Sequence, residues 1–247
     1  MDTRGRARIG LLVPYTNSNL EPDFAMMKPD GASIHVARMG GYDEDEIPDA
    51  GQMQALGASD LDTPLSLLSG VKPDVMVYGC TSATLAHGPE FDRNLSERIA
   101  QQTGAHTVTA AGALVYALKA LDGEAIGFAS PYVSEINDLA IGFLAEHGVT
   151  TVARADIGVE LSNDGQGALT PRDVFDLGLR ADTPDAQVLV LSCTDMRSVE
   201  TLEALEERLG KPVICSNQAM MFQVMRLLDM PDKLDGFGRL LREGSTP

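Results

Sequence analysis

The sequence has no tryptophan, and aromatic side chains make up only 5% of its 247 residues. Its core must therefore rest on Ala, Val, Leu, Ile and Met. No stretch approaches the 18 consecutive apolar residues typical of a membrane-spanning helix, and no apolar signal-peptide region follows Met1–Arg4. We expect a soluble, cytoplasmic protein with no membrane partner.

Basic residues are scarce. Nineteen Lys and Arg residues stand against 36 Asp and Glu residues, which gives a formal net charge of -17. Such a surface repels phosphate backbones and anionic lipid, so we expect no nucleic-acid partner. It also opposes the long-range attraction of an anionic substrate. A site for a carboxylate would have to be built from local dipoles and hydrogen-bond donors.

Cysteine and histidine are also few. Three cysteines without clustered spacing favour a reducing compartment over a disulfide framework. No Cys-x-x-Cys or His-x-x-x-His spacing predicts a metal site, and Gly236-Phe237-Gly238 lacks the strand–turn–helix context of a dinucleotide site. The acidic run 43–46 is interpreted as a solvated loop. We expect an enzyme that uses no metal and no organic cofactor.

Short apolar runs alternate with amphipathic stretches along the whole chain. Strands are predicted at Arg8–Val13, Ser33–Ala37, Asp74–Tyr78, Thr107–Thr109, Ala125–Ala129, Thr151–Ala155, Gln187–Leu191 and Pro212–Ile214. Helices are predicted between them, including Ser96–Gln102, Ala113–Leu121, Glu135–His147 and Val199–Leu209. This succession predicts an α/β fold with mostly parallel sheets covered by helices.

Three pairs of segments resemble one another in the same order. Residues 9–15 resemble 126–132, residues 74–81 resemble 187–194, and residues 104–108 resemble 210–214. Buried parallel strands look alike, so one match could be chance, but three in order predict two pseudo-symmetric halves. We place the first half at 1–120 and the second at 121–219. The C-terminal segment 220–247 is expected to pack back on the first half.

Cys80 and Cys193 occupy equivalent positions in the repeat. Each follows an apolar strand and precedes a predicted helix, at the sheet edge where α/β proteins bind ligands. A helix N-terminus favours a thiolate. A buried free cysteine is often merely structural, but core packing does not require two cysteines at matching points. We predict that both are catalytic and that Cys215, at the end of another strand, is structural.

Polar side chains crowd the same edge of the predicted sheets. Asn17 lies in the loop after Pro14, and Tyr132 lies in the matching loop of the second half. Thr81 and Ser82 follow Cys80, and Thr194 follows Cys193. These groups are equally suited to capping helices and to holding a carboxylate. We predict that they contact a small carboxylate substrate.

Together these motifs resemble the aspartate/glutamate racemase superfamily, and within it the maleate cis–trans isomerase and arylmalonate decarboxylase branch. The resemblance runs from about Arg8 to Pro231 and rests on Val13-Pro14, Asn17 through Glu21, Ser130-Pro131-Tyr132 and the paired cysteines. It implies two flavodoxin-like halves with the active site between them, in a homo-oligomer.

The resemblance also implies roles for individual residues. In maleate isomerases the first cysteine is the nucleophile and the second handles a proton, which assigns these roles to Cys80 and Cys193. Substrate contacts would fall on Pro14, Asn17, Tyr132 and Asn163. One departure is notable: the hydroxyls of Thr81 and Ser82 are typical of arylmalonate decarboxylases, which lack the first cysteine.

The main functional hypothesis is therefore a cofactor-independent, two-cysteine isomerase of the maleate cis–trans type. Three alternatives remain open at this point. They are an amino-acid or hydroxy-acid racemase, a cofactor-free decarboxylase of the arylmalonate type, and a carboxylate-binding module without turnover.

Overall fold

The computed structural model describes residues 5–40, 47–230 and 233–243. It contains two four-stranded sheets with the orders β2-β1-β3-β4 and β6-β5-β7-β8, and every strand pair is parallel. The strands are β1 (Ala7–Pro14), β2 (Ala32–Met39), β3 (Val75–Tyr78), β4 (His106–Thr109), β5 (Ala125–Ser130), β6 (Thr150–Asp156), β7 (Val188–Leu191) and β8 (Val213–Cys215). All eight predicted strands and the predicted fold class are confirmed. The acidic run 43–46 lies outside the described residues.

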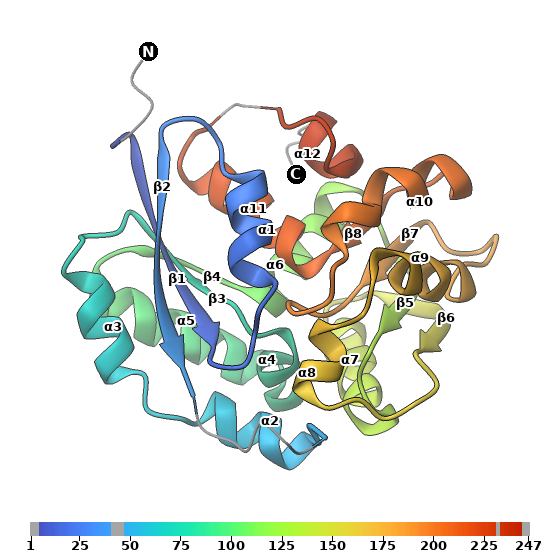
Figure 1. Ribbon diagram of the computed structural model, residues 1–247, viewed down its shortest axis with the longest axis horizontal. Coiled ribbons are helices and arrows are strands. Elements are labelled where there is room, and N and C mark those ends of the chain that lie inside the picture. Colours follow the sequence, from blue (N-terminus) through green and yellow to red (C-terminus); the bar gives the residue numbers. More distant parts are fainter. Residues whose placement is uncertain (1–4, 41–46, 231–232, 244–247) are drawn as a thin grey trace.

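Helices cover both sheets, and the two halves lie side by side (Figure 1). The first half contains α1 (Leu20–Met27), α2 (Ala50–Gly57), α3 (Asp62–Ser69), α4 (Thr81–His87), α5 (Pro89–Thr103) and α6 (Ala110–Ala120). The second contains α7 (Ser134–Glu146), α8 (Asn163–Gly167), α9 (Pro171–Arg180), a 3-10 turn (Val199–Thr201) and α10 (Leu202–Leu209). Helices α11 (Ser216–Leu227) and α12 (Gly238–Glu243) follow.

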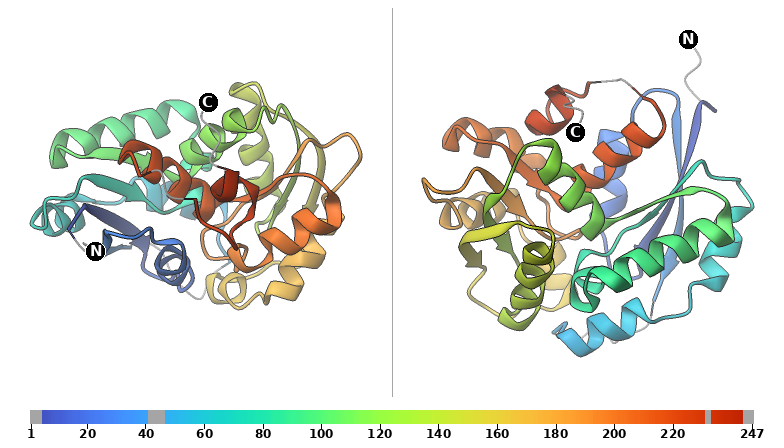
Figure 2. Two further views of the ribbon diagram at one scale, coloured as in Figure 1. Left: turned by 90° about the horizontal axis from the view of Figure 1, so that it is seen from above. Right: turned by 180° about the vertical axis from the view of Figure 1, so that it is seen from behind.

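The strands alternate their side chains between two apolar clusters because successive residues of a strand point to opposite faces. Leu11 and Val13 of β1 belong to a large cluster that runs through both halves. Leu12 belongs to a smaller one on the other face, under α2, α3 and α5. The right view of Figure 2, which shows the molecule from behind, has α5 lying along that face of the first sheet. The large shared cluster joins the two halves into one core.

Equivalent positions in the two sheets meet the same packing constraint. A Cβ atom on Gly10 of β1 would lie 2.4 Å from the sulfur of Met76, and one on Gly127 of β5 would lie 2.3 Å from the carbonyl oxygen of Ala181. Thr109 and Cys215 end the matching strands β4 and β8, and each caps the following helix with its side chain. This capping role agrees with a structural interpretation of Cys215, which is fully buried.

The C-terminal helices contact both halves. Helix α11 packs against α6, α1 and β4, whereas α12 packs against α10, α11 and β8. Position 219, where a boundary is predicted, lies inside α11. The division of the chain at 120 and 219 stays a prediction. None of the helices in the described ranges is long and apolar enough to cross a bilayer.

Candidate active site

Cys80 lies just beyond the carboxyl end of β3 and is the N-cap residue of helix α4. Its side chain is 5% exposed. The backbone N–H groups of Ala83 and Ser82 donate toward the thiol, and the Ser82 hydroxyl lies 3.7 Å from its sulfur. The sequence-based expectation of a helix directly after Cys80 is confirmed, and this helix start surrounds the sulfur with hydrogen-bond donors.

Cys193 lies at the equivalent end of β7 and is 4% exposed, but the helix expected directly after it is absent. Residues 194–198 form an irregular loop before the 3-10 turn. The reason is that Asp195 uses its carboxylate to bind the other half of the molecule instead of starting a helix. Its backbone N–H still donates to the Cys193 sulfur, at 3.3 Å.

The buried Tyr132 side chain lies near both thiols. Cys193, Cys80 and Ser82 all act on its hydroxyl. Tyr132 is 5% exposed, and its backbone N–H donates to the Ser130 hydroxyl at 3.1 Å, which fixes the turn after β5. Cys80, Ser82, Tyr132 and Cys193 therefore form one buried group at the junction of the halves.

A second set of hydrogen bonds crosses the same junction. The Asn17 side-chain amide donates to the Thr194 hydroxyl at 3.0 Å, and that hydroxyl donates to the carbonyl of Gly79 at 3.1 Å. Asn17 also accepts from the backbone N–H groups of Asn19 and Leu20. These bonds place the loop after β1 against the residues that flank both cysteines.

The remaining predicted residues lie near this group. Thr81 is 1% exposed, and its hydroxyl has no hydrogen-bond partner among the described residues. The carbonyl of Pro14 accepts from the Asn17 N–H at 3.0 Å. Asn163 is buried at the start of α8, one turn before Gln166, whose side-chain oxygen lies 3.9 Å from the Cys193 sulfur.

Sequence reasoning missed four residues of this region: Asn19, Met53, Gln166 and Asp195. The Ser82 hydroxyl donates to the sulfur of Met53 on α2, and Asn19 and Asp195 bind each other across the junction. Asp195 carried a signal because it stands two residues after Cys193, and Asn19 carried one because it stands two residues after Asn17. Met53 and Gln166 reach the site from helices distant in sequence.

Burial raises the pKa of both thiols, but their neighbours differ. At Cys80 the N–H groups of Ala83 and Ser82 partly oppose this rise. At Cys193 the nearby Asp195 carboxylate adds to it, and the pKa is raised to about 12. Burial also raises the pKa of Tyr132 well above its ordinary value. All three groups are therefore mainly protonated at neutral pH.

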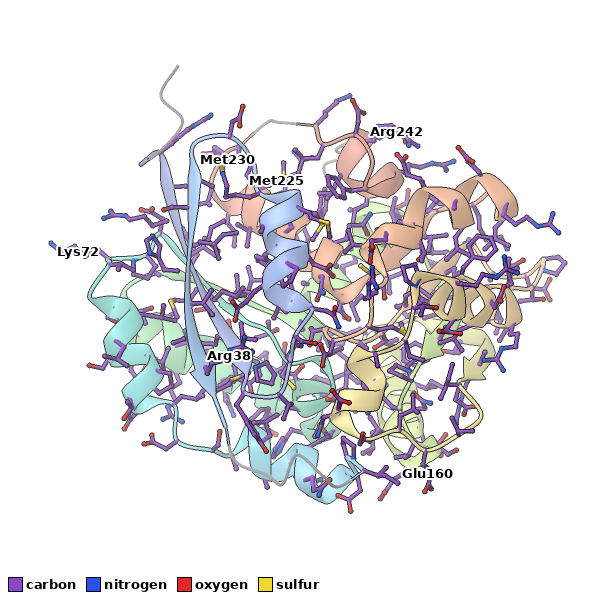
Figure 3. The ribbon with its side chains drawn as sticks, in the orientation of Figure 1. Arg38, Lys72, Glu160, Met225, Met230 and Arg242 are labelled. Carbon is purple, nitrogen blue, oxygen red and sulfur yellow. The ribbon has the colours of Figure 1, made fainter. Side chains whose placement is uncertain are left out.

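In the part of the chain that the structure describes, no cluster of three His, Cys, Asp or Glu side chains is placed to bind a metal ion. Arg38 donates to the carbonyls of Pro14 and Asn17 and pairs with Glu21. Figure 3 shows Arg38 beside the strands of the first sheet and Glu160 at the edge of the molecule, below α8.

The sequence model described as arylmalonate decarboxylase matches residues 9–241, nearly the whole chain. The chain belongs to the arylmalonate decarboxylase family. The predicted family branch is thus confirmed. Within this family the sequence is 26% identical to the arylmalonate decarboxylase of Bordetella bronchiseptica, over 95% of this chain and 96% of that protein.

Maleate isomerases are also among the proteins to which this chain is similar. The maleate isomerase of Nocardia farcinica is 29% identical, with 98% of each chain covered. A solved structure of a cysteine-to-serine mutant of the N. farcinica maleate cis–trans isomerase superposes with a TM-score of 0.87, at 26% identity, and covers 96% of this chain and 98% of that chain. That structure is described as holding a covalently bound succinylcysteine intermediate.

Proposed function

We propose that this protein is a cofactor-independent isomerase that converts maleate, or a closely similar cis-dicarboxylate, into its trans isomer. The observation that supports this most strongly is the pair of buried thiols at equivalent strand ends, both of which act on the buried Tyr132 hydroxyl. The N. farcinica relative, with its maleate isomerase name and succinylcysteine intermediate, supports the same chemistry.

In the proposed reaction Cys80 is the nucleophile and Cys193 carries the proton. The Cys80 thiolate adds to one alkene carbon, and the electron pair of the double bond moves to the other carbon and its carboxylate. The Cys193 thiol then protonates that carbon, which leaves a C–C single bond that rotates. The Cys193 thiolate removes the proton again, the C–S bond breaks, and the trans alkene leaves with Cys80 again a thiolate and Cys193 again a thiol.

Local donors support the two carboxylates of such a substrate. Thr81, Ser82 and Tyr132 offer hydroxyls, and Asn17, Asn163 and Thr194 offer amide or hydroxyl groups at the same junction. We propose that they hold the carboxylates and the negative charge that develops during addition. Pro14 would shape the loop. The buried Thr81 hydroxyl, which has no partner among the described residues, is suited to receive a substrate oxygen.

Decarboxylation is the second candidate, because the family match and the Thr81–Ser82 pair both favour it. The substrate would be a malonate derivative that carries two carboxylates on one carbon. One would leave as CO2, the hydroxyls would hold the resulting enediolate, and Cys193 would protonate it. Cys80 would have no covalent role in that reaction.

An NMR incubation in D2O separates these functions. The protein is mixed in turn with maleate, an arylmalonate, and single enantiomers of amino acids. We expect fumarate from maleate only, at the same rate with and without EDTA. CO2 loss from the arylmalonate would favour the second candidate, and deuterium exchange at an amino-acid α-carbon would favour racemisation. No change in any mixture would favour a binding module.

We further propose that the protein acts in the cytoplasm as a homo-oligomer, without a nucleic-acid or membrane partner. The charge of -17 supports the absence of both partners, because it repels phosphate groups. Sedimentation velocity of the intact chain tests the oligomer: a single monomer species at micromolar concentration would contradict it.

A further inference from the structure

Asp195 and Asn19 form a contact between the halves directly beside Cys193. One carboxylate oxygen of Asp195 accepts from the backbone N–H groups of Ser18 and Asn19, at 2.8 and 3.0 Å. The Asn19 side-chain amide donates to the same oxygen at 3.0 Å and to the Asp195 carbonyl at 2.8 Å. Asp195 is 8% exposed, so these bonds are largely shielded from water.

This contact joins three segments of the candidate site. The first is the loop after β1, which carries Asn17. The second is the loop after β7, because the Asp195 N–H donates to the Cys193 sulfur. The third is helix α8, because the Asn19 amide also donates to the carbonyl of Gly167 at 3.0 Å. Helix α8 in turn brings Gln166 to the Cys193 sulfur.

We propose that Asp195 and Asn19 are positioning residues that fix the Cys193 thiol against the first half and against α8, and that hold the Asp195 carboxylate beside this thiol. In this scheme neither side chain contacts the substrate, and Asp195 reaches the Cys193 sulfur only through its backbone N–H. The role in turnover rests on the proposed function, because it assumes that Cys193 carries the proton.

The Asp195 carboxylate is charged at neutral pH, and few other titratable groups lie beside the Cys193 thiol. Burial raises the pKa of Asp195 to about 6, opposed by the bonds from Ser18 and Asn19, so the group is mainly ionised at pH 7. The titratable neighbours that act on Cys193 are Asp195, Tyr132 and Cys80, and Asp23 of α1 lies near Asp195. Tyr132 and Cys80 are mainly neutral there, so Asp195 is the charged neighbour of the thiol.

Alkylation of Cys193 by iodoacetamide tests the inference independently of turnover. It is followed by mass spectrometry from pH 7 to 10 in a Cys80→Ser background. Asp195→Asn keeps an acceptor oxygen but removes the charge, so the pH dependence should move to lower pH and the rate at pH 8 should rise about 3- to 10-fold. Asn19→Ala keeps the Asp195 charge but loosens the loops. The alkylation rate should therefore rise at every pH, while its pH dependence stays where it is in the parent.

Glu206→Gln is the matched control. Glu206 is also a buried acid that accepts two backbone N–H bonds, from Val213 and Arg239, but it does not act on either thiol. Its variant should alkylate as the parent does. Parent-like alkylation in both Asp195→Asn and Asn19→Ala would overturn the inference.

Turnover provides the second readout. In chains with both thiols, Asp195→Asn and Asn19→Ala should lower kcat for maleate about 10-fold with little change in KM, because the Cys80 side of the site is untouched. Both should still form a substrate adduct on Cys80. If wild-type protein neither converts maleate nor forms an adduct, the proposed function fails, while the alkylation result still decides the positioning claim.

Discussion

At the scale of single residues, the two thiols have different neighbours, and these neighbours suit them to different catalytic roles. The sulfur of Cys80 receives backbone N–H groups of a helix start, which favour its thiolate, and lies near the Ser82 hydroxyl. The sulfur of Cys193 lies beside the Asp195 carboxylate, which disfavours its thiolate. The first environment suits a nucleophile, and the second suits a group that gives a proton and takes it back.

The pH dependence of turnover follows from this difference. Because burial raises the pKa of Cys80, its thiolate is the minor form at neutral pH and grows as the pH rises. Burial and the Asp195 carboxylate raise the pKa of Cys193 to about 12, so this thiol stays mainly protonated up to pH 9. We therefore expect kcat/KM for maleate to increase from pH 6 to pH 9 in steady-state kinetics. Circular dichroism at each pH serves as the control that the protein stays folded. A decrease over this range in folded protein would contradict the assignment.

Tyr132 lies near both Cys80 and Cys193. Tyr132→Phe removes the hydroxyl on which Cys193, Cys80 and Ser82 act but keeps the buried ring. Loss of one such donor should lower kcat about 10²-fold. Steady-state kinetics with maleate measure this, and the thermal unfolding curve serves as the control. Unchanged kcat would remove Tyr132 from the site.

At the scale of helices and strands, local sequence pattern predicts the scaffold well. The strands were predictable because apolar runs such as Val75–Tyr78 are buried on both faces and are bounded by turn residues. The missing helix after Cys193 was not predictable, because Asp195 is committed to Ser18 and Asn19, more than 170 residues away in sequence. Met53 and Gln166 were missed for the same reason: only tertiary packing brings them to the thiols.

Helix α6 offers a test of the element scale. Thr109 ends β4 and accepts from the Gly112 N–H at 3.1 Å, so it caps the helix. Thr109→Ala should lower the free energy of unfolding by about 1 kcal/mol, whereas Thr109→Ser should cost less because it keeps the acceptor. Urea unfolding measures both. Equal stability of the two variants would show that the cap contributes nothing.

At the scale of the whole molecule, a contiguous core holds two similar sheets so that their carboxyl ends meet. Buried acids lie in this junction. Burial raises the pKa of Asp23 to about 7 and that of Asp195 to about 6, from 3.8. Asn217 donates to Asp23 at 2.7 Å and to the Thr194 carbonyl at 3.0 Å, which links the acid to the Cys193 loop.

These acids predict how stability depends on pH. Between about pH 4 and pH 7 the folded protein binds more protons at Asp23 than the unfolded chain, so the free energy of unfolding should fall as the pH rises. The slope contributed by each group is at most about 1.4 kcal/mol per pH unit. Asp23→Asn should flatten the decline in urea unfolding at pH 5, 6 and 7. An identical slope in the variant would contradict this account.

The central claim is that Cys80 bonds to the substrate and Cys193 moves the proton. Intact mass spectrometry of Cys80→Ser and Cys193→Ser after incubation with maleate tests it most directly. Both variants should lose most of their turnover, and Cys193→Ser should accumulate one substrate molecule on Cys80, while Cys80→Ser should carry none. An adduct on Cys193 alone would contradict the account. Full turnover in a variant that carries both Cys80→Ser and Cys193→Ser would also contradict it.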